Sequence, residues 1–182
     1  MTTANKLTIL RMALIPVFLG VLYAGFNGSQ YVALGVFIIA SLTDTLDGYV
    51  ARHCDQVTNF GKFMDPLADK VLVMAAMCWF VEQGRMPGWV LAVVLLREFA
   101  ISGMRLVAVE QGRVIAAGWS GKVKTAATMV CLCLMLAFAA PGPYGSAPDY
   151  IALASNIIIV ATTLYSGAEY LIKNRDVFKN AK

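Results

Sequence analysis

The sequence predicts an all-α polytopic membrane protein, a bundle of six transmembrane helices forming one domain over residues 1–182. Of the 182 residues, 59% are hydrophobic and only 14% are charged, whereas charged residues make up about a quarter of a soluble domain. Six apolar stretches approach the roughly 20 residues that cross a bilayer as a helix. None of them shows the period-2 alternation of a membrane β-strand. Helices are therefore the expected spanning elements.

The six stretches are separated by short segments that carry Gly, Pro, Asn or charged residues, which mark turns between helices. No repeat of fixed period and no linker of biased composition divides the chain. In chain order, the expected spans are Leu7–Phe26, Tyr31–Val50, Pro66–Val81, Gly88–Val109, Thr125–Ala140 and Tyr150–Ile172.

The positive charges predict the orientation of the spans, because short loops rich in Lys and Arg stay in the cytoplasm. With six spans both termini share one side, and that side receives all of the 15 Lys and Arg residues except Arg85 and Arg97. We therefore expect cytoplasmic termini and cytoplasmic 52–65 and 105–124 connections. The net charge of +4 fits this bias and contact with anionic membrane lipids. No nucleic-acid partner is expected.

Acidic residues are concentrated in one segment. Five of the eleven fall between Asp44 and Asp69, and Asp44, Asp47, Asp65 and Asp69 lie at the ends of apolar helices. A carboxylate at the centre of a membrane helix costs roughly 2.5–3.5 kcal/mol on insertion scales. Four of them near the membrane therefore require compensation.

The spacing of these residues indicates the form of that compensation. Residues three or four apart share a helix face, and the short connection from His53 to Phe60 makes the two helices antiparallel neighbours. Four like charges at close range need cations among them. An all-oxygen site suits Mg²⁺ or Mn²⁺, which bind substrate phosphates, and two ions could clamp a pyrophosphate. The residues on the two facing stripes are Asp44, Asp47 and Ala51, and Gly61, Asp65 and Asp69.

This segment resembles the signature of the CDP-alcohol phosphotransferase family. It reads Asp44-x2-Asp47-Gly48-x2-Ala51-Arg52-x8-Gly61-x3-Asp65-x3-Asp69 and matches at every specified position. The resemblance implies a homodimer of six-helix subunits with two Mg²⁺ or Mn²⁺ ions. It also implies attack of an alcohol on the β-phosphorus of a CDP-linked donor, with CMP leaving.

The resemblance assigns roles to individual residues. The four aspartates, Asp44, Asp47, Asp65 and Asp69, would be metal ligands, and Asp69 would also be the general base that deprotonates the alcohol. Glycines at 48 and 61 allow backbone and ligand to approach closely, and a guanidinium is a forked donor to phosphate oxygens. The implied CDP-lipid contacts are Asn5, Thr8, Arg11, Gly48, Ala51, Arg52, Thr58 and Gly61.

Motifs outside the signature are similar to a bacterial branch of the family, which acts in the cell membrane with CDP-diacylglycerol as donor and sn-glycerol 3-phosphate as acceptor. These motifs are Asn5-x-Leu7-Thr8-x2-Arg11, Asp65-Pro66-Leu67-Ala68-Asp69-Lys70, Arg97-Glu98 with Arg105, and Gly121-Lys122-Val123-Lys124-Thr125. We expect Arg105, Lys122 and Lys124 to hold the acceptor phosphate, because an anionic substrate needs a basic cradle. Positive-inside bias alone would also place basic residues there.

Two alternative functions stay open at this point. A sibling enzyme could use an inositol phosphate or phosphatidylglycerol as acceptor. A divalent-cation transporter also carries intramembrane carboxylates, although here they gather near one boundary and the halves show no inverted repeat.

Arg97 and Glu98 lie within the fourth span, where they form either a buried polar network or a substrate contact. As helix neighbours they need not pair, and Glu98 shares a face with Arg105, which it could orient.

Overall fold

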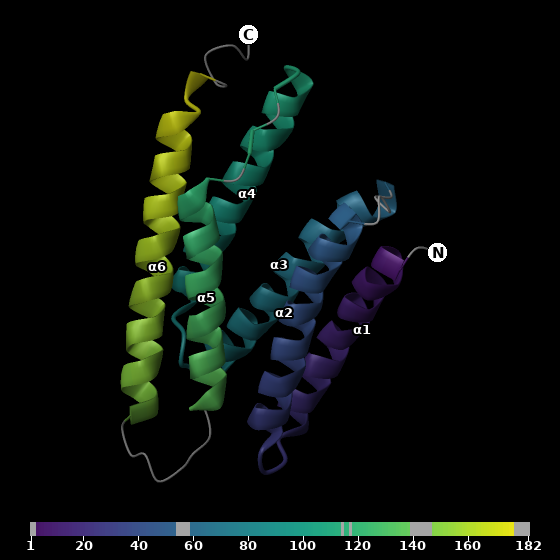
Figure 1. The fold of residues 1–182 in the computed structure, drawn as a ribbon. Helices are drawn as coiled ribbons and strands as arrows, with labels where there is room; N and C mark the ends of the chain where they lie inside the picture. The colour runs from purple at the N-terminus through teal and green to yellow at the C-terminus, as the bar shows by residue number, and fades with distance from the viewer. Residues whose placement is uncertain (1–2, 54–58, 114, 117, 139–146, 177–182) are drawn as a thin grey trace. The chain divides into compact units, whose positions relative to one another are not determined.

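The computed structural model is all-helical in the residues that it describes, which are 3–53, 59–113, 115–116, 118–138 and 147–176 (Figure 1). Side chains are described for residues 9–43, 70–113, 115–116, 118–138 and 149–176. No strand occurs in these ranges, so the predicted all-α class is confirmed. The helices are α1 (Thr3–Ala24), α2 (Ser29–His53), α3 (Asn59–Glu82), α4 (Gly88–Glu110), α5 (Trp119–Ala137) and α6 (Ala147–Lys173).

Each helix extends beyond the apolar stretch that predicted it, at one end or at both. Helix α2 continues to His53, α3 begins at Asn59 instead of Pro66, and α5 begins at Trp119 instead of Thr125. Lys and Arg have helix propensities close to that of Leu, so a helix continues after its hydrophobic stretch has ended. As a result, Lys122 and Lys124 lie within the first two turns of α5, where a connection was predicted.

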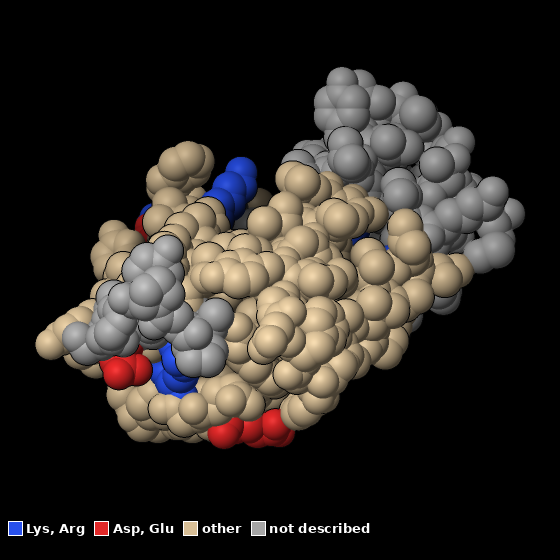
Figure 2. Space-filling view, turned by 90° about the horizontal axis from the view of Figure 1, so that it is seen from below, with Lys and Arg blue, Asp and Glu red and all other residues tan. Residues whose placement is uncertain are grey.

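Two of the described helices are long and apolar enough to cross a membrane, judged by length and composition: Trp119–Ala137, and Asp149–Lys173 within α6. Helix α4 contains charged residues along its length, including Arg97, Glu98 and Arg105. It nevertheless exposes Leu96 and Phe99 at 73% and 70%. Figure 2 shows one face of the molecule, on which most described atoms belong to uncharged residues. Extensive exposed apolar surface is unusual for a soluble monomer.

The chain divides into two compact units, of which the first comprises Met1–Trp79 and Cys133–Pro148. Its helices α1 and α2 pack against each other. The rings of Phe18 and Phe37, both fully buried, lie with centroids 5.7 Å apart in a tilted arrangement. Gly25 and Gly28, in the turn between these helices, have φ values of 62° and 87°, which favour residues without a Cβ.

The second unit comprises Phe80–Leu132 and Asp149–Lys182. Helix α4 ends where Gly112 adopts a φ of 72° and the Arg113 amide donates to the Ala108 carbonyl at 2.8 Å, the pattern of a Schellman cap. Near this end a small core forms from Ile101, Met104, Ala108 and Tyr170. The Tyr170 ring therefore joins the last part of α6 to α4.

Candidate active site and a buried polar network

The acidic signature occupies the two helix ends that flank one short connection. Helix α2 is regular to His53, α3 is regular from Asn59, and residues 54–58 join them. Positions 47 and 65 are each six residues from their helix ends, about 9 Å at 1.5 Å per residue. Positions 44 and 69 are nine and ten residues from those ends. In an antiparallel pair of helices, 47 would lie level with 65, and 44 with 69.

Most of the residues predicted to form the site are not among those whose side chains the structure describes. Among the side chains that are described, no group of three or more His, Cys, Asp or Glu residues could hold a metal ion. The metal and CDP-lipid assignments therefore remain predictions. The residues outside the described side chains are Asn5, Thr8, Asp44, Asp47, Gly48, Ala51, Arg52, Thr58, Gly61, Asp65 and Asp69.

Arg11 is the predicted CDP-lipid contact whose side chain is described. It is 1% exposed and is among the largest fully buried side chains. It belongs to α1, which packs on α2, the helix that carries residues 44–53. A guanidinium buried to this degree needs acceptors within the protein or on a ligand, because an unpaired buried charge is costly.

Helices α4, α5 and α6 are joined by a network of largely buried charges. Arg97 Nη1 donates to Glu98 Oε1 at 2.7 Å, and Arg97 Nη2 donates to Ser166 Oγ at 2.5 Å. Lys124 Nζ donates to the same Glu98 oxygen at 2.8 Å. The side chains of Arg97 and Glu98 are each 14% exposed and that of Lys124 is 7% exposed. One carboxylate thus pairs two cations from two helices.

Two of the predictions about this region can now be compared with the structure. Arg97 and Glu98 do pair, although the helical angle between neighbours does not require it. The polar-network interpretation of these residues is confirmed. Lys124, predicted to bind the acceptor phosphate, is buried and ion-paired with Glu98. A contact between Lys124 and substrate stays a prediction.

Two glycines make room for the Arg97 side chain. A Cβ on Gly121 would lie 3.5 Å from Arg97 Nη2, and a Cβ on Gly167 would lie 3.2 Å from Arg97 Cγ. Arg97 therefore passes across glycines of α5 and α6, and these helices can approach α4 closely. The motif from Gly121 to Lys124 thus has two roles in the network. Gly121 leaves room for the Arg97 side chain, and Lys124 is itself the second cation bound to Glu98.

We expect the two glycines to respond differently to alanine. Gly121→Ala makes an ordinary contact and should raise the Tm, because Ala is favoured over Gly in a helix by about 1 kcal/mol. Gly167→Ala forces the hydrogen-bonded Arg97 to move, and overpacking costs about 1–3 kcal/mol. Its Tm should fall below that of the wild type. Thermal unfolding in detergent measures both, and equal stability of the two variants would contradict this interpretation.

Arg105 is oriented by α6. Its Nε donates to Tyr170 Oη at 3.1 Å, and its guanidinium carbon lies 5.5 Å from the centroid of the Tyr170 ring. The expectation that Glu98 orients Arg105 is wrong for the described contacts, which give this role to Tyr170. Arg105 is partly exposed and Lys122 is exposed.

Sequence reasoning missed the contribution of α6. Ser166 and Tyr170 bind the two arginines of α4, and Gly167 makes room for Arg97. A signal was present, since these residues and Thr163 recur at positions i, i+3, i+4 and i+7 in an apolar helix. Such a stripe of small and polar residues is typical of a helix–helix interface in a membrane.

Comparison with known proteins identifies the class. A family model described as CDP-alcohol phosphatidyltransferase matches residues 1–166, and the chain belongs to this family. It is therefore a phosphatidyltransferase, of a family whose enzymes depend on divalent metal ions.

Curated relatives match along nearly the whole chain. A CDP-diacylglycerol–glycerol-3-phosphate 3-phosphatidyltransferase of Bacillus subtilis is 40% identical over 97% of both chains. An enzyme with the same name from Shigella flexneri serotype 5b is 38% identical over 91% of this chain and 90% of the relative. A probable phosphatidylglycerophosphate synthase of Mycobacterium tuberculosis is 35% identical over 93% of this chain and 80% of the relative.

Proposed function

We propose that this protein transfers the phosphatidyl group of CDP-diacylglycerol to sn-glycerol 3-phosphate, forming phosphatidylglycerol phosphate and releasing CMP. The observation that carries the proposal is the 40% identity, over 97% of both chains, to a Bacillus subtilis enzyme named for this reaction. The complete acidic signature between Asp44 and Asp69 supports it. We propose that residues 1–182 act as one phosphotransferase domain.

In the proposed reaction, a hydroxyl oxygen of glycerol 3-phosphate forms a bond to the β-phosphorus of the donor. The bond between that phosphorus and the oxygen bridging to CMP breaks, and CMP leaves with the bonding electrons. Asp69 accepts the proton of the attacking hydroxyl, as a carboxylate within hydrogen-bond reach can. Arg52 donates to phosphate oxygens of the CDP group. Atoms and charge balance without an oxidant or a reductant.

The residues present suit two Mg²⁺ or Mn²⁺ ions. Asp44, Asp47, Asp65 and Asp69 supply only oxygen donors, the ligands that these hard cations prefer. The helical register supports this assignment, because two carboxylate positions on α2 and two on α3 are at matching distances from the connection. When bound, the ions would neutralise the phosphates of the donor and the developing charge on the leaving CMP. Gly48 and Gly61 allow the CDP group to approach the backbone.

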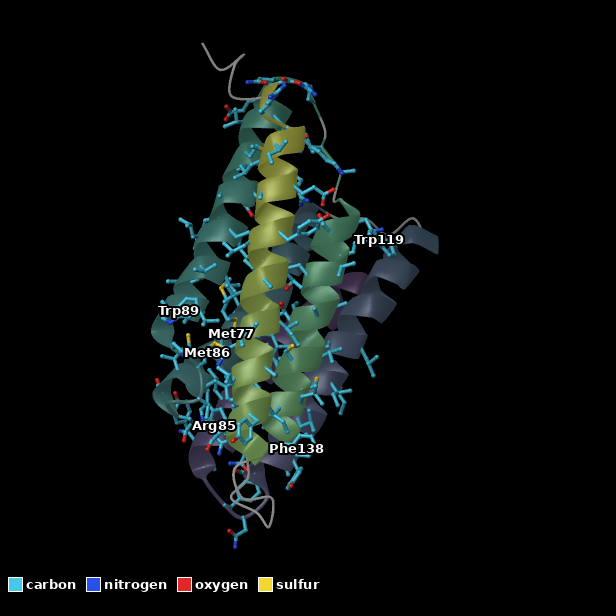
Figure 3. All side chains as sticks on the ribbon, turned by 90° about the vertical axis from the view of Figure 1, so that its left-hand side faces the viewer. Met77, Arg85, Met86, Trp89, Trp119 and Phe138 are labelled. Carbon is cyan, nitrogen blue, oxygen red and sulfur yellow. The ribbon has the colours of Figure 1, made fainter. Side chains whose placement is uncertain are left out.

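We propose that all six helices span the bacterial cell membrane, with the termini and the acidic site on the cytoplasmic side. Support comes from the second unit. Trp89 and Trp119 begin α4 and α5 and are 60% and 78% exposed; their side chains are labelled in Figure 3. Exposed Trp residues at the ends of apolar helices are typical of the aromatic belts of membrane proteins. Arg105 lies in the last two turns of α4, Arg113 follows that helix and Lys122 lies in the first turn of α5, whereas Arg85 precedes the start of α4.

We propose that Arg105, Lys122 and Lys124 bind the acceptor phosphate. The motifs outside the signature that contain these residues, and the partial exposure of Arg105, support this assignment. Asn5, Thr8, Arg11, Ala51 and Thr58 complete the proposed CDP-lipid contacts. From the family resemblance we propose that the enzyme is a homodimer.

The acceptor decides between this function and that of its siblings. Purified protein in detergent and lipid, with Mg²⁺ and CDP-diacylglycerol, is expected to release CMP when sn-glycerol 3-phosphate is added. Inositol phosphate and phosphatidylglycerol are the matched acceptors for comparison. Equal or faster CMP release with either of them would contradict the proposed acceptor, and no release with any alcohol would contradict the transferase reaction itself.

A further inference from the structure

The contact between Arg105 and Tyr170 leaves part of the arginine available. The guanidinium donates from Nε to Tyr170 Oη at 3.1 Å. No residue that the structure describes accepts a hydrogen bond from Nη1 or Nη2 of Arg105. These two nitrogens form the fork with which arginine binds phosphate in a bidentate manner. Tyr170 therefore binds Arg105 through Nε, the guanidinium nitrogen that bidentate phosphate binding by Nη1 and Nη2 does not use.

Tyr170 itself is fixed by the protein core. It is 7% exposed and packs with Ile101, Met104 and Ala108 of α4. The guanidinium carbon of Arg105 lies 5.5 Å from the centroid of the Tyr170 ring, which adds a cation–π interaction. A long side chain such as Arg loses rotamer freedom when it binds a ligand. A hydroxyl held by a packed ring reduces that loss, because Arg105 is already oriented before substrate arrives.

Arg105 also lies where the other basic residues of this unit gather. It is seven residues after Glu98, about 10 Å along α4 and within about 20° of the same helix face. Lys124 of α5 contacts Glu98 at 2.8 Å. Helices α4 and α5 are antiparallel, so a residue that precedes Lys124 on α5 lies beside a residue that follows Glu98 on α4. Lys122 is therefore closer than Lys124 to the level of Arg105 along α4. Nη1 and Nη2 of Arg105 therefore lie in the part of the second unit that also contains Lys122 and Lys124.

We propose that Tyr170 is a positioning residue for the acceptor phosphate, holding Arg105 through Nε so that Nη1 and Nη2 bind the phosphate of glycerol 3-phosphate. This inference rests on the proposed function. It assigns a role in acceptor affinity to α6, which contains none of the acidic signature. Tyr170 acts through Arg105 and touches no reacting atom.

The test replaces only the hydroxyl. Tyr170→Phe is expected to raise the KM for glycerol 3-phosphate about five- to tenfold, within the range for losing one typical hydrogen bond. The kcat should stay within about twofold and the KM for CDP-diacylglycerol should not change, since the ring and the core remain. Tyr165→Phe, the same change at a residue of α6 that is 69% exposed, is the matched control. Thermal unfolding shows whether both variants remain folded.

A double-variant cycle tests whether Tyr170 acts through Arg105. In an Arg105→Lys background, Tyr170→Phe should add no further increase in KM, because the ammonium lacks the fork that Tyr170 orients. An unchanged acceptor KM in Tyr170→Phe, a parallel rise for both substrates, or full additivity with Arg105→Lys would each overturn the inference. Wild-type CMP release that does not depend on glycerol 3-phosphate would instead overturn the proposed function, and the inference with it.

Discussion

Asp69→Asn is expected to reduce acceptor-dependent CMP release by at least about 10³-fold. Asparagine keeps the size of the side chain but cannot accept the proton of the attacking hydroxyl, and a general base alone contributes roughly 10²- to 10⁴-fold. The same change removes one carboxylate from the proposed metal site, which adds to the loss. CMP release at saturating glycerol 3-phosphate measures the effect on kcat.

The matched control is Asp149→Asn, which removes an exposed carboxylate from the first turn of α6. This variant should retain wild-type CMP release. Equal thermal unfolding of Asp69→Asn and the wild type would show that the loss is chemical. A fully active Asp69→Asn enzyme would reject Asp69 as base, and the acidic site would need another residue in this role.

The sequence was sufficient to predict the helices but not their ends. Six apolar stretches predicted six helices in the correct order, because segments of spanning length leave little choice of secondary structure. Hydropathy follows the hydrocarbon boundary, whereas a helix ends where its backbone is capped. Helix α4 ends at the Gly112 cap, and α5 begins at Trp119, six residues before its apolar stretch. Lys122 and Lys124 were consequently predicted in a connection.

Patterns within one helix were informative about the candidate site, whereas contacts between helices were not. The spacings between Asp44 and Asp47 and between Asp65 and Asp69 are local and predict shared faces. The contacts of Arg97 with Ser166 and of Arg105 with Tyr170 join residues 69 and 65 positions apart. No periodicity links such partners. The stripe on α6 indicated a buried face, but its partner was evident only from the fold.

The largest stability effect is expected at Glu98. Glu98→Gln keeps the shape of the side chain but leaves the buried Lys124 and the partly buried Arg97 without the carboxylate between them. Removing one partner of a buried ion pair costs about 3–5 kcal/mol. For a chain of this size the lower end corresponds to a fall in Tm of roughly 6–12 °C. Thermal unfolding of the purified protein in detergent measures it.

Two variants determine whether charge is the cause. Glu169→Gln removes the carboxylate of the α6 ion pair with Lys173, an exposed lysine, and should leave the Tm nearly unchanged because exposed pairs contribute little. Lys124→Met in the Glu98→Gln background removes one of the two unpaired cations and should recover part of the lost Tm. Additive losses in the double variant would show that Glu98 stabilises the helices through packing. Partial recovery would show that its charge holds Lys124 within the protein.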